Sequence, residues 1–323
     1  MAYIPTTKKI SVYDIVTEKI IKLLGEGIIP WQKPSTQTPA LNLVTKRPYE
    51  GINTMLLRYG YTSPYWLTFA QAKKMGGYVN SGEKGTPIVW WSMFKKDKKD
   101  VNGNTILTAS GEAQQEVIPV LRYYTVFNTE QCTLPEGKVP ETPVRDDLTA
   151  VGSVVEHYAD CPEIQYGNFA SGSYSDDLDQ IKMPVVENFD SEENFHAGLF
   201  HELVHSTRHI KRLNRKERKE SFKAANGFED LVAEIGSAFL CYETGIETTI
   251  PNQTAYIAEW LTALNADKRM IVYASSSAQK AVEHIIKKNK AIEQTVEIAS
   301  SSPEENAPQS IPETLQGDIY DIL

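Results

Sequence analysis

The stretch that decides the fold runs from Phe195 to Arg215 and reads FHAGLFHELVHSTRHIKRLNR. At its centre, His201, Glu202 and His205 form an HExxH pattern. Residues four apart lie on one face of a helix, so the two imidazoles can bind one metal ion. Glu202 stands beside them, where it can take a proton from a water that the metal polarises. The pattern therefore predicts a helix with a metal site on one face.

The residues around the pattern favour a helix. Ser191 suits the N-cap position, and Glu192 and Glu193 suit the first turn. No Pro or Gly falls between Leu199 and Arg215. The sequence therefore predicts a helix that continues beyond the second histidine.

A tetrahedral catalytic zinc needs a third protein ligand and keeps its fourth position for water. The best candidate is Glu234, in the stretch GFEDLVAEIGSAFL of a second expected helix. Small residues such as Gly236 would let the two helices approach closely. A carboxylate among apolar neighbours needs a partner, which favours a ligand over a solvated helix residue.

His209 competes with Glu234 for the role of third ligand. It lies four residues beyond His205 on the same expected helix, and no glycine is present to bend the chain back toward the metal. A continuous helix would carry His209 a full turn away from the ion. We therefore interpret His209 as a neighbour of the site or a surface residue.

Two strands, 164–170 and 180–184, are expected just before the metal-binding helix, with Tyr174 between them. Many metallopeptidases hold an extended substrate against such an edge strand. Tyr174 is therefore a candidate for stabilising an oxyanion, and the alternative is a packing residue.

Several longer motifs occur in a fixed order. HELVHSTRHIKRLNR is followed by EDLVAEIGSAFLC and AYIAEWLTALNADKR, and the first half contains VTEKIIKLLGEGIIPWQKP, NLVTKRPYEGIN, WLTFAQAKKMGGYVNSGEKGTPIVWW and YYTVFNTEQC. Over roughly residues 10–290 the chain resembles the ArdC antirestriction protein family of conjugative plasmids and related mobile elements. The resemblance implies an N-terminal domain that binds single-stranded DNA, which also occurs in plasmid primases, and a zincin-like metallopeptidase domain.

Charge is unevenly distributed along the 323 residues, whose net charge is −9. Residues 1–135 carry 16 Lys and Arg against 10 Asp and Glu. Residues 136–290 carry 17 Lys and Arg against 25 Asp and Glu, and residues 291–323 carry no Lys or Arg against 7 Asp and Glu. A polyanionic partner is therefore expected at the basic first third of the chain.

The expected fold class is α+β, with a small antiparallel-sheet N-terminal domain followed by a mainly helical zincin-like metallopeptidase domain. We assign 1–135 to single-stranded-DNA binding, 136–147 to a linker, 148–290 to the metallopeptidase domain and 291–323 to a disordered acidic tail. The remaining expected elements are helices at 11–25, 69–75, 148–158, 256–264 and 276–290, strands at 88–94 and 117–128, a hairpin loop at 81–85 and an insertion at 95–116.

Aromatic residues alternate along the two N-terminal strands, and basic residues lie close to them in sequence. Aromatic rings can stack on bases while lysines follow the phosphates, as binding of single strands without sequence preference requires. The alternative is that half of these rings face the domain core. The candidate DNA contacts are Lys46, Arg47, Lys73, Lys74, Lys84, Trp90, Trp91, Lys95, Lys96, Arg122 and Tyr124.

The cysteines, the start of the chain and the lengths of the apolar segments indicate the cellular compartment. Cys132, Cys161 and Cys241 are scattered, which suggests a reducing compartment. The start of the chain lacks the apolar core of a signal peptide, and no segment reaches the length of a membrane span. We expect a cytoplasmic protein with no membrane partner, and the sequence does not indicate an oligomeric state.

Two classes of function follow. The first is a zinc-dependent peptidase, with another divalent metal as the alternative cofactor, joined to a module that binds single-stranded DNA and protects incoming DNA from restriction. Its protein or peptide substrate is unknown. The second is a single-stranded-DNA-binding protein whose metal site is structural or vestigial. The intact Glu202 favours the enzyme, because a structural zinc usually has protein at its fourth position and no use for a base.

Overall fold

The computed structural model describes residues 11–32, 38–57, 59–143, 149–215, 225–247 and 253–286. The predicted acidic tail, residues 144–147 of the predicted linker and residue 148, where the second predicted domain begins, lie outside these ranges. The helices are α1 (Val12–Gly25), α2 (Ile52–Leu57), α3 (Phe69–Lys74), α4 (Val151–His157), α5 (Glu192–Ser206), α6 (Ala225–Thr244), α7 (Gln253–Ala266) and α8 (Met270–Ile286). The strands are β1 (Leu41–Asn42), β2 (Tyr65–Thr68), β3 (Tyr78–Val79), β4 (Thr86–Asp97), β5 (Gln115–Asn128), β6 (Cys132–Thr133), β7 (Glu163–Gly167), β8 (Ser173–Ser175) and β9 (Gln180–Pro184). The predicted α+β class is confirmed.

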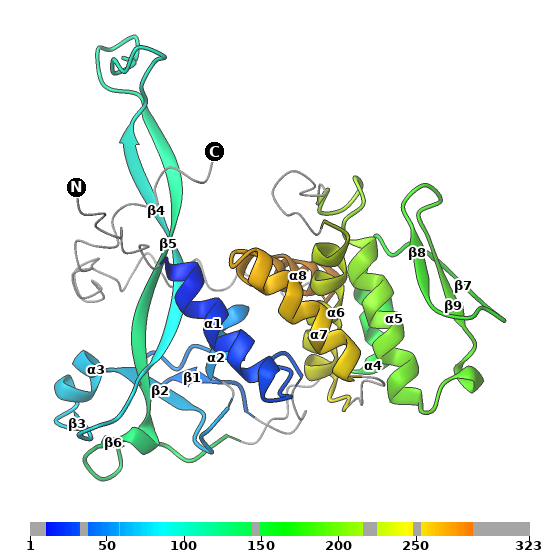
Figure 1. Ribbon diagram of the computed structural model, residues 1–323, viewed down its shortest axis with the longest axis horizontal. Coiled ribbons are helices and arrows are strands. Elements are labelled where there is room, and N and C mark those ends of the chain that lie inside the picture. Colours follow the sequence, from blue (N-terminus) through cyan, green and yellow to red (C-terminus); the bar gives the residue numbers. More distant parts are fainter. Residues whose placement is uncertain are drawn as a thin grey trace, which may run out of the picture.

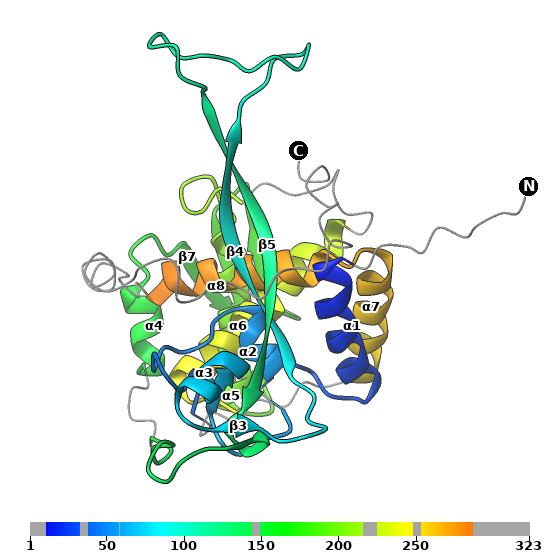
Figure 2. The same ribbon diagram turned by 90° about the vertical axis from the view of Figure 1, so that its left-hand side faces the viewer.

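The N-terminal sheet has the strand order β1-β2-β5-β4. Its long strands β4 and β5 pair without a break from Thr86 opposite Val126 to Asp97 opposite Gln115. The outer part of this ribbon projects from the body as an arm (Figures 1 and 2). The expected insertion at 95–116 is therefore the end of the arm, and only the β1–β2 pair departs from the predicted antiparallel arrangement by being parallel.

The loop at 81–85 does not close a hairpin, which corrects the prediction from the sequence. β3 pairs with β6 in a separate two-stranded sheet and not with the following strand β4. Gln131 stabilises this arrangement: its side-chain amide donates to Glu83 at 2.8 Å and to the carbonyl of Lys84 at 3.0 Å. These bonds hold the loop against the end of β5 and direct the chain into the larger sheet.

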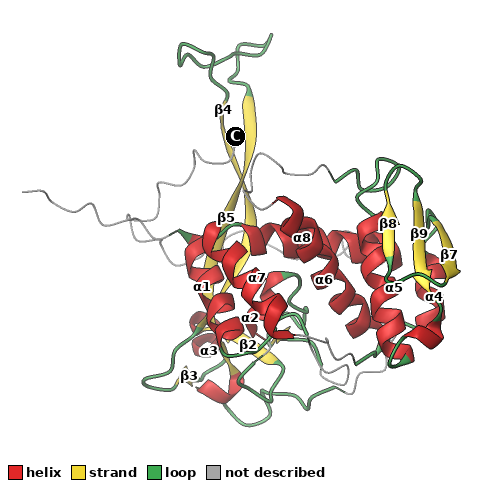
Figure 3. Cartoon of the chain, turned by 45° about the vertical axis from the view of Figure 1, so that its right-hand side comes forward, coloured by secondary structure: helices red, strands yellow, loops and turns green. Residues whose placement is uncertain are grey.

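The second half of the chain packs helices around α5. α5 lies between α6 and a three-stranded sheet of order β7-β9-β8 (Figure 3). β9 is central, parallel to β7 and antiparallel to β8, with Tyr174 opposite Ile181. This makes β8 an edge strand beside the HExxH helix, whereas the sequence predicts strands only at 164–170 and 180–184, the second of which is the central strand. None of the described helices combines the length and the apolar character needed to cross a membrane.

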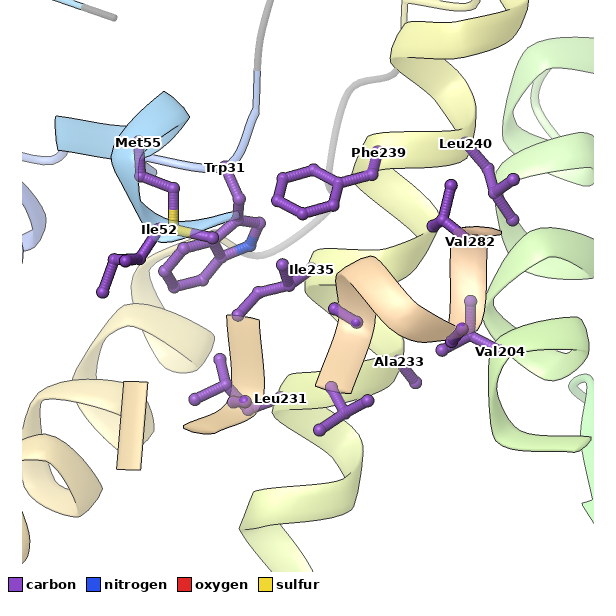
Figure 4. Close-up of a cluster of buried hydrophobic side chains, with 14 of the residues drawn as sticks. Trp31, Ile52, Met55, Val204, Leu231, Ala233, Ile235, Phe239, Leu240 and Val282 are labelled. Carbon is purple, nitrogen blue, oxygen red and sulfur yellow. The ribbon is translucent and has the colours of Figure 1, made fainter. Parts of the chain in front are cut away.

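One hydrophobic core joins both halves of the chain. Trp31 is fully buried and lies edge-on against Trp260 of α7, with ring centroids 4.8 Å apart. Figure 4 shows Trp31 and Met55 from the N-terminal half beside Ile235 of α6. The buried Thr17 hydroxyl donates to the carbonyl of Lys268 at 2.5 Å, which fixes α1 against the start of α8. The two predicted domains therefore share their interior.

α5 ends at Ser206, whereas the sequence predicts a helix that continues toward Arg215. Side chains further along the chain bind the last helical carbonyls and so replace the next helical turn. Arg212 Nε donates to the carbonyl of Ser206 at 2.7 Å, and Arg215 Nη2 donates to the carbonyl of Val204 at 3.3 Å. Asn214 adopts a left-handed backbone with φ of 46°, which completes the change of direction.

Candidate metal centre

Close packing of α5 on α6 positions the site. Ser191 caps α5 as predicted, its hydroxyl accepting from the Asn194 N–H at 3.2 Å. Further along the interface, the Ser237 hydroxyl of α6 donates to the carbonyl of Ala197 at 2.8 Å. Gly236 comes so near to α5 that no side chain fits there. The small residues noted in the sequence do allow the close helix contact.

The two imidazoles of the HExxH pattern converge. His201 Nε2 and His205 Nε2 are 3.1 Å apart. Two nitrogens that each lie roughly 2.0–2.1 Å from a tetrahedral zinc are about 3.3 Å apart. Burial lowers the pKa of His201 to about 3, helped by the neighbouring His205, so the His201 ring is neutral at pH 7 and its lone pair is free to bind a metal. The spacing and the neutral ring fit a divalent metal ion.

Two carboxylates of α6 face these imidazoles. Glu234 Oε1 lies 3.6 Å from His201 Nδ1, and Asp230 Oδ1 lies 3.8 Å from His205 Nε2. Burial raises the pKa of Glu234 to about 7. Among the described residues, no three side chains of His, Cys, Asp or Glu are arranged closely enough to hold a metal ion in this conformation. The assignment of Glu234 as third ligand remains a prediction, and Asp230 faces the nitrogen on the metal side.

Sequence reasoning missed Asp230, although a signal was available. Asp230 and Glu234 are four residues apart and so project from the same face of α6. Two acidic residues at this spacing can address the two imidazoles of an HExxH helix one each. The exposed fraction of Asp230, 69%, leaves it free to move toward a cation.

Glu202 is buried beside the histidines, with 8% of its surface exposed. Burial raises the pKa of its carboxyl group, while His205 and the nearby backbone N–H of Tyr174 act in the opposite direction. A Cβ at Gly172 would lie 3.2 Å from Glu202 Oε1. The chain leading into β8 therefore passes tightly over the carboxylate and presents a donor to it.

The side chain of Tyr174 is engaged elsewhere. Its hydroxyl donates to Asp179 Oδ1 at 2.9 Å and accepts from Arg212 Nη2 at 3.0 Å. Burial raises the pKa of Tyr174, and the bond to Asp179 adds to the effect. In this conformation the hydroxyl proton points to Asp179, so the oxyanion role of Tyr174 stays a prediction while its backbone N–H serves Glu202.

His209 lies apart from the paired imidazoles. Its Nδ1 is 3.8 Å from Asp179 Oδ2, on the segment that follows α5. This placement agrees with its interpretation as a neighbour of the site, although the reason differs from the predicted one. The helix has already ended at Ser206, so His209 occupies a turn and not a further helical face.

A buried ion pair next to His205 was not predicted. Arg215 and Glu229 form a two-pronged contact in which Arg215 Nε donates to Glu229 Oε2 at 3.1 Å. Glu229 Oε1 is 3.9 Å from His205 Nδ1, a nitrogen that is buried without a hydrogen-bond partner among the described residues. This distance is too long for a hydrogen bond, but Glu229 is the carboxylate that faces Nδ1 of His205.

The N-terminal sheet brings three of the candidate DNA contacts together. Trp90 pairs with Arg122, and Tyr124 lies two residues further along β5 on the same face. Trp90 is 40% exposed, and Arg122 Nε is buried without a hydrogen-bond partner among the described residues. Trp91 points to the opposite face, where its ring lies 5.9 Å from that of Tyr273. Of the two tryptophans, Trp90 is the outward one.

The other basic candidates lie on four segments: the loop after β1, α3, the loop before β4 and the arm. In Figure 1 the arm projects away from β1 and α3, which lie at the same end of the N-terminal half. Lys96 pairs with Glu116 at 2.9 Å, and Lys46 lies over the ring of Tyr65 at 5.0 Å. The exposed candidates are Lys46, Arg47, Lys73, Lys74, Lys84 and Lys95.

Two family models match the chain in the order expected. Residues 10–127 match the N-terminal domain of anti-restriction factor ArdC. Residues 159–277 match a zincin-like metallopeptidase. The second match contains the converging imidazoles and both facing carboxylates.

Curated relatives include two DNA primases TraC of Escherichia coli, 31% and 32% identical over 288 residues. The matches cover 85% of this chain but only 20% and 27% of those proteins, so the chain spans about a fifth to a quarter of their length. An uncharacterized protein of Sinorhizobium fredii is 28% identical to this chain, and the match covers 89% of that protein.

Solved structures give the most complete comparison. The metal-free antirestriction protein ArdC of plasmid R388 is 33% identical with a TM-score of 0.64, and the match covers 87% of this chain and 98% of that one. Its Mn(II)-bound form is 34% identical, with the same TM-score and coverages of 86% and 97%. Sequence and fold thus agree over nearly the whole of that protein, and the chain belongs to the ArdC antirestriction protein family.

Proposed function

We propose that this chain is a metal-dependent peptidase that also binds single-stranded DNA and acts in antirestriction. The observation that carries the peptidase is the pair of imidazole nitrogens 3.1 Å apart, with a buried carboxylate on the same helix. A structural metal site would not need a general base such as Glu202, and it would have a protein ligand at its fourth position.

Each residue has a defined task in this proposal. His201 and His205 hold a divalent cation through Nε2, and a carboxylate of α6 supplies the third ligand. Asp230 is the better placed of the two because it faces Nε2 of His205, whereas Glu234 faces Nδ1 of His201 and can hold that ring in position. A cation bound there polarises a water molecule and the carbonyl of a peptide bond. Glu202 accepts the proton of that water and passes it to the departing amine.

The edge strand β8 supports binding of a polypeptide. A substrate in extended form can pair with its free edge, which brings the peptide bond over Glu202. The backbone N–H of Tyr174 then keeps the Glu202 carboxylate turned toward the site. Zinc and manganese are both compatible with these ligands, and a solved relative is described as Mn(II)-bound.

Binding of single-stranded DNA is supported by a different observation. Trp90, Arg122 and Tyr124 share one face of the β4–β5 ribbon, where the exposed Trp90 ring can stack on a base and the Arg122 guanidinium can pair with phosphate, while Tyr124 is partly buried against the cluster that contains Ile88. The match to the N-terminal domain of ArdC covers this ribbon. We assign the face, and not the outer arm, to DNA, because residues 95–116 carry four lysines against four acidic residues.

The peptidase is tested with the purified full chain. Metal content is measured first, and then cleavage of casein and of a peptide library is followed with Zn²⁺ or Mn²⁺, with and without single-stranded DNA. Metal-dependent cleavage that disappears in Glu202→Gln supports the enzyme. Stoichiometric metal without cleavage of any peptide favours the alternative, a DNA-binding protein with a structural or vestigial site.

A further inference from the structure

The segment from Thr207 to Arg215, directly after the HExxH helix, contains buried arginine side chains. It carries three arginines, Arg208, Arg212 and Arg215, and the side chains of the last two are only 2% and 11% exposed. Surface loops seldom bury guanidinium groups, because each buried charge needs partners. The partners here belong to different elements of the candidate site.

Arg212 binds the β8–β9 hairpin. Its guanidinium pairs with Asp179 and donates to the Tyr174 hydroxyl at 3.0 Å. The same side chain donates to the carbonyls of Ser206 at 2.7 Å and Asp160 at 2.9 Å. Asp179 has a left-handed backbone with φ of 48°, an uncommon conformation outside glycine that these contacts help to hold. Arg212 thus ties the end of α5 to the strand whose N–H reaches Glu202.

Arg215 binds α6 instead. It makes the two-pronged contact with Glu229 and also donates to the Thr207 hydroxyl at 2.8 Å and to the carbonyl of Val204 at 3.3 Å. Glu229 in turn faces His205 Nδ1. A metal-binding imidazole commonly donates its second N–H to a carboxylate, which fixes the ring orientation and the tautomer.

The contacts of Arg212 and Arg215, which are three residues apart in the chain, therefore divide between two targets, the β8–β9 hairpin and Glu229 of α6. Arg208 adds to the first target by pairing with Asp176. Both arginines also bind the last carbonyls of α5, but those bonds do not by themselves require the contacts with Asp179 and Glu229. Moreover, Asp179 is served by Lys211 at 3.3 Å as well as by Arg212, so charge neutralisation alone does not require a buried guanidinium. The fork geometry of arginine is what joins several fixed acceptors at once.

We propose that Arg212 and Arg215 are positioning residues with separate tasks. Arg215 holds Glu229 so that it accepts the Nδ1–H of His205 and directs Nε2 at the metal. Arg212 holds β8 so that the Tyr174 N–H and the edge strand stay in register with Glu202. This inference rests on the proposed metal site, and it adds that metal affinity and turnover depend on different arginines.

Metal affinity tests the first task in the full-length protein. Zn²⁺ affinity is measured by competition with a chromophoric chelator, and the coordination is followed by the Co²⁺ absorption spectrum. Arg215→Lys and Glu229→Gln should each weaken Zn²⁺ binding about 10–100-fold and alter the Co²⁺ bands. The double variant should lose little more than either single one, because both act through the same carboxylate. Arg212→Lys is the matched control and should retain wild-type affinity.

Turnover tests the second task. With a cleaved peptide from the library, Arg212→Lys and Asp179→Asn should lower kcat while leaving the bound metal and its Co²⁺ spectrum unchanged. A general loss of structure would lower metal content and kcat together. Circular dichroism checks folding, and the nearly isosteric Glu229→Gln and Asp179→Asn keep the test valid if an arginine variant does not fold.

The outcomes separate cleanly. Wild-type protein that binds neither Zn²⁺ nor Co²⁺ overturns the proposed metal site itself. If the wild type binds metal and Arg215→Lys and Glu229→Gln bind it equally well, the first task is wrong. If Arg212→Lys loses metal as strongly as Arg215→Lys, or keeps full kcat, the division of tasks is wrong.

Discussion

Gly236 on α6 faces Val204 on α5 so closely that a Cβ at position 236 would lie 2.8 Å from both Val204 methyl carbons. Real Cβ atoms do not approach other carbons to this distance, so any side chain would push the helices apart. This contact sets the distance between α6, which carries Asp230 and Glu234, and α5, which carries the two imidazoles. One glycine therefore links the helix spacing to the proposed metal site.

Gly236→Ala should destabilise the protein by about 1–3 kcal/mol, because the added methyl overpacks the helix contact. It should also weaken metal binding, since the α6 carboxylates move away from α5. Thermal unfolding and metal titration measure the two effects. Gly152→Ala in α4 is the control, because its Cβ would meet no atom within 4 Å. Equal unfolding temperatures for both variants would contradict the prediction.

His201→Ala and His205→Ala should each remove most of the bound metal, because each loses one of the two converging nitrogens. The third ligand is tested by comparing Asp230→Asn with Glu234→Gln in the same elemental analysis. The geometry predicts the larger loss for Asp230→Asn and a smaller one for Glu234→Gln. The reverse order would restore Glu234 as the ligand. Unchanged metal in the double histidine variant would remove the site altogether.

Glu202→Gln should retain the metal and lose peptide hydrolysis by about 10²–10⁴-fold, because the amide cannot accept a proton. Measuring metal content and the initial rate on one preparation separates the two properties. His209→Gln is a suitable control, since His209 faces Asp179 and not the paired imidazoles. Wild-type rates in Glu202→Gln would exclude a general base at this position.

Trp90→Ala should weaken binding of single-stranded DNA with little change in its salt dependence, because stacking releases no counterions. Arg122→Ala should reduce the slope of log K against log salt by about 0.7, the value for one phosphate contact on a single strand. Fluorescence anisotropy at several salt concentrations measures both. Lys96→Ala serves as a control, because Lys96 already pairs with Glu116. Tighter binding of duplex than of single strand would contradict the stacking face.

Trp31→Ala should destabilise the whole chain by about 3–5 kcal/mol, the usual cost of emptying a large buried site. Because Trp31 contacts Trp260 in the second half, DNA binding and metal binding should be lost at the same denaturant concentration. Two separate unfolding transitions in the wild type would contradict a shared core. Tyr78→Ala, at a residue that is 59% exposed, is the control.

Local patterns predicted the elements that local rules govern. The Ser191 cap and the strand Gln180–Pro184 follow from capping preferences and from the alternation of apolar residues. The spacing of the HExxH residues likewise required only helical geometry. These features depend on neighbours within a few residues, which a sequence displays directly.

Features that depend on distant partners were beyond such rules. The early end of α5 comes from arginines that reach back to its carbonyls, and helix propensity contains no sign of them. The burial of Trp91 depends on Tyr273, almost two hundred residues away in the chain. The proximity of Asp230 to His205 depends on how α6 packs against α5, which the sequence does not display. A period of two along β4 gave the alternation of its faces but could not say which one is outward.

The continuous interior of the molecule also bears on how such genes are inherited. The 288-residue match to the TraC primases extends across both halves although it fills only a fifth to a quarter of those proteins. A cassette whose parts share Trp31 and Trp260 cannot be cut in the middle without exposing both faces to water. Recombination would then preserve it only as a whole, so that a larger protein acquires the β4–β5 ribbon and the zincin-like fold in a single step.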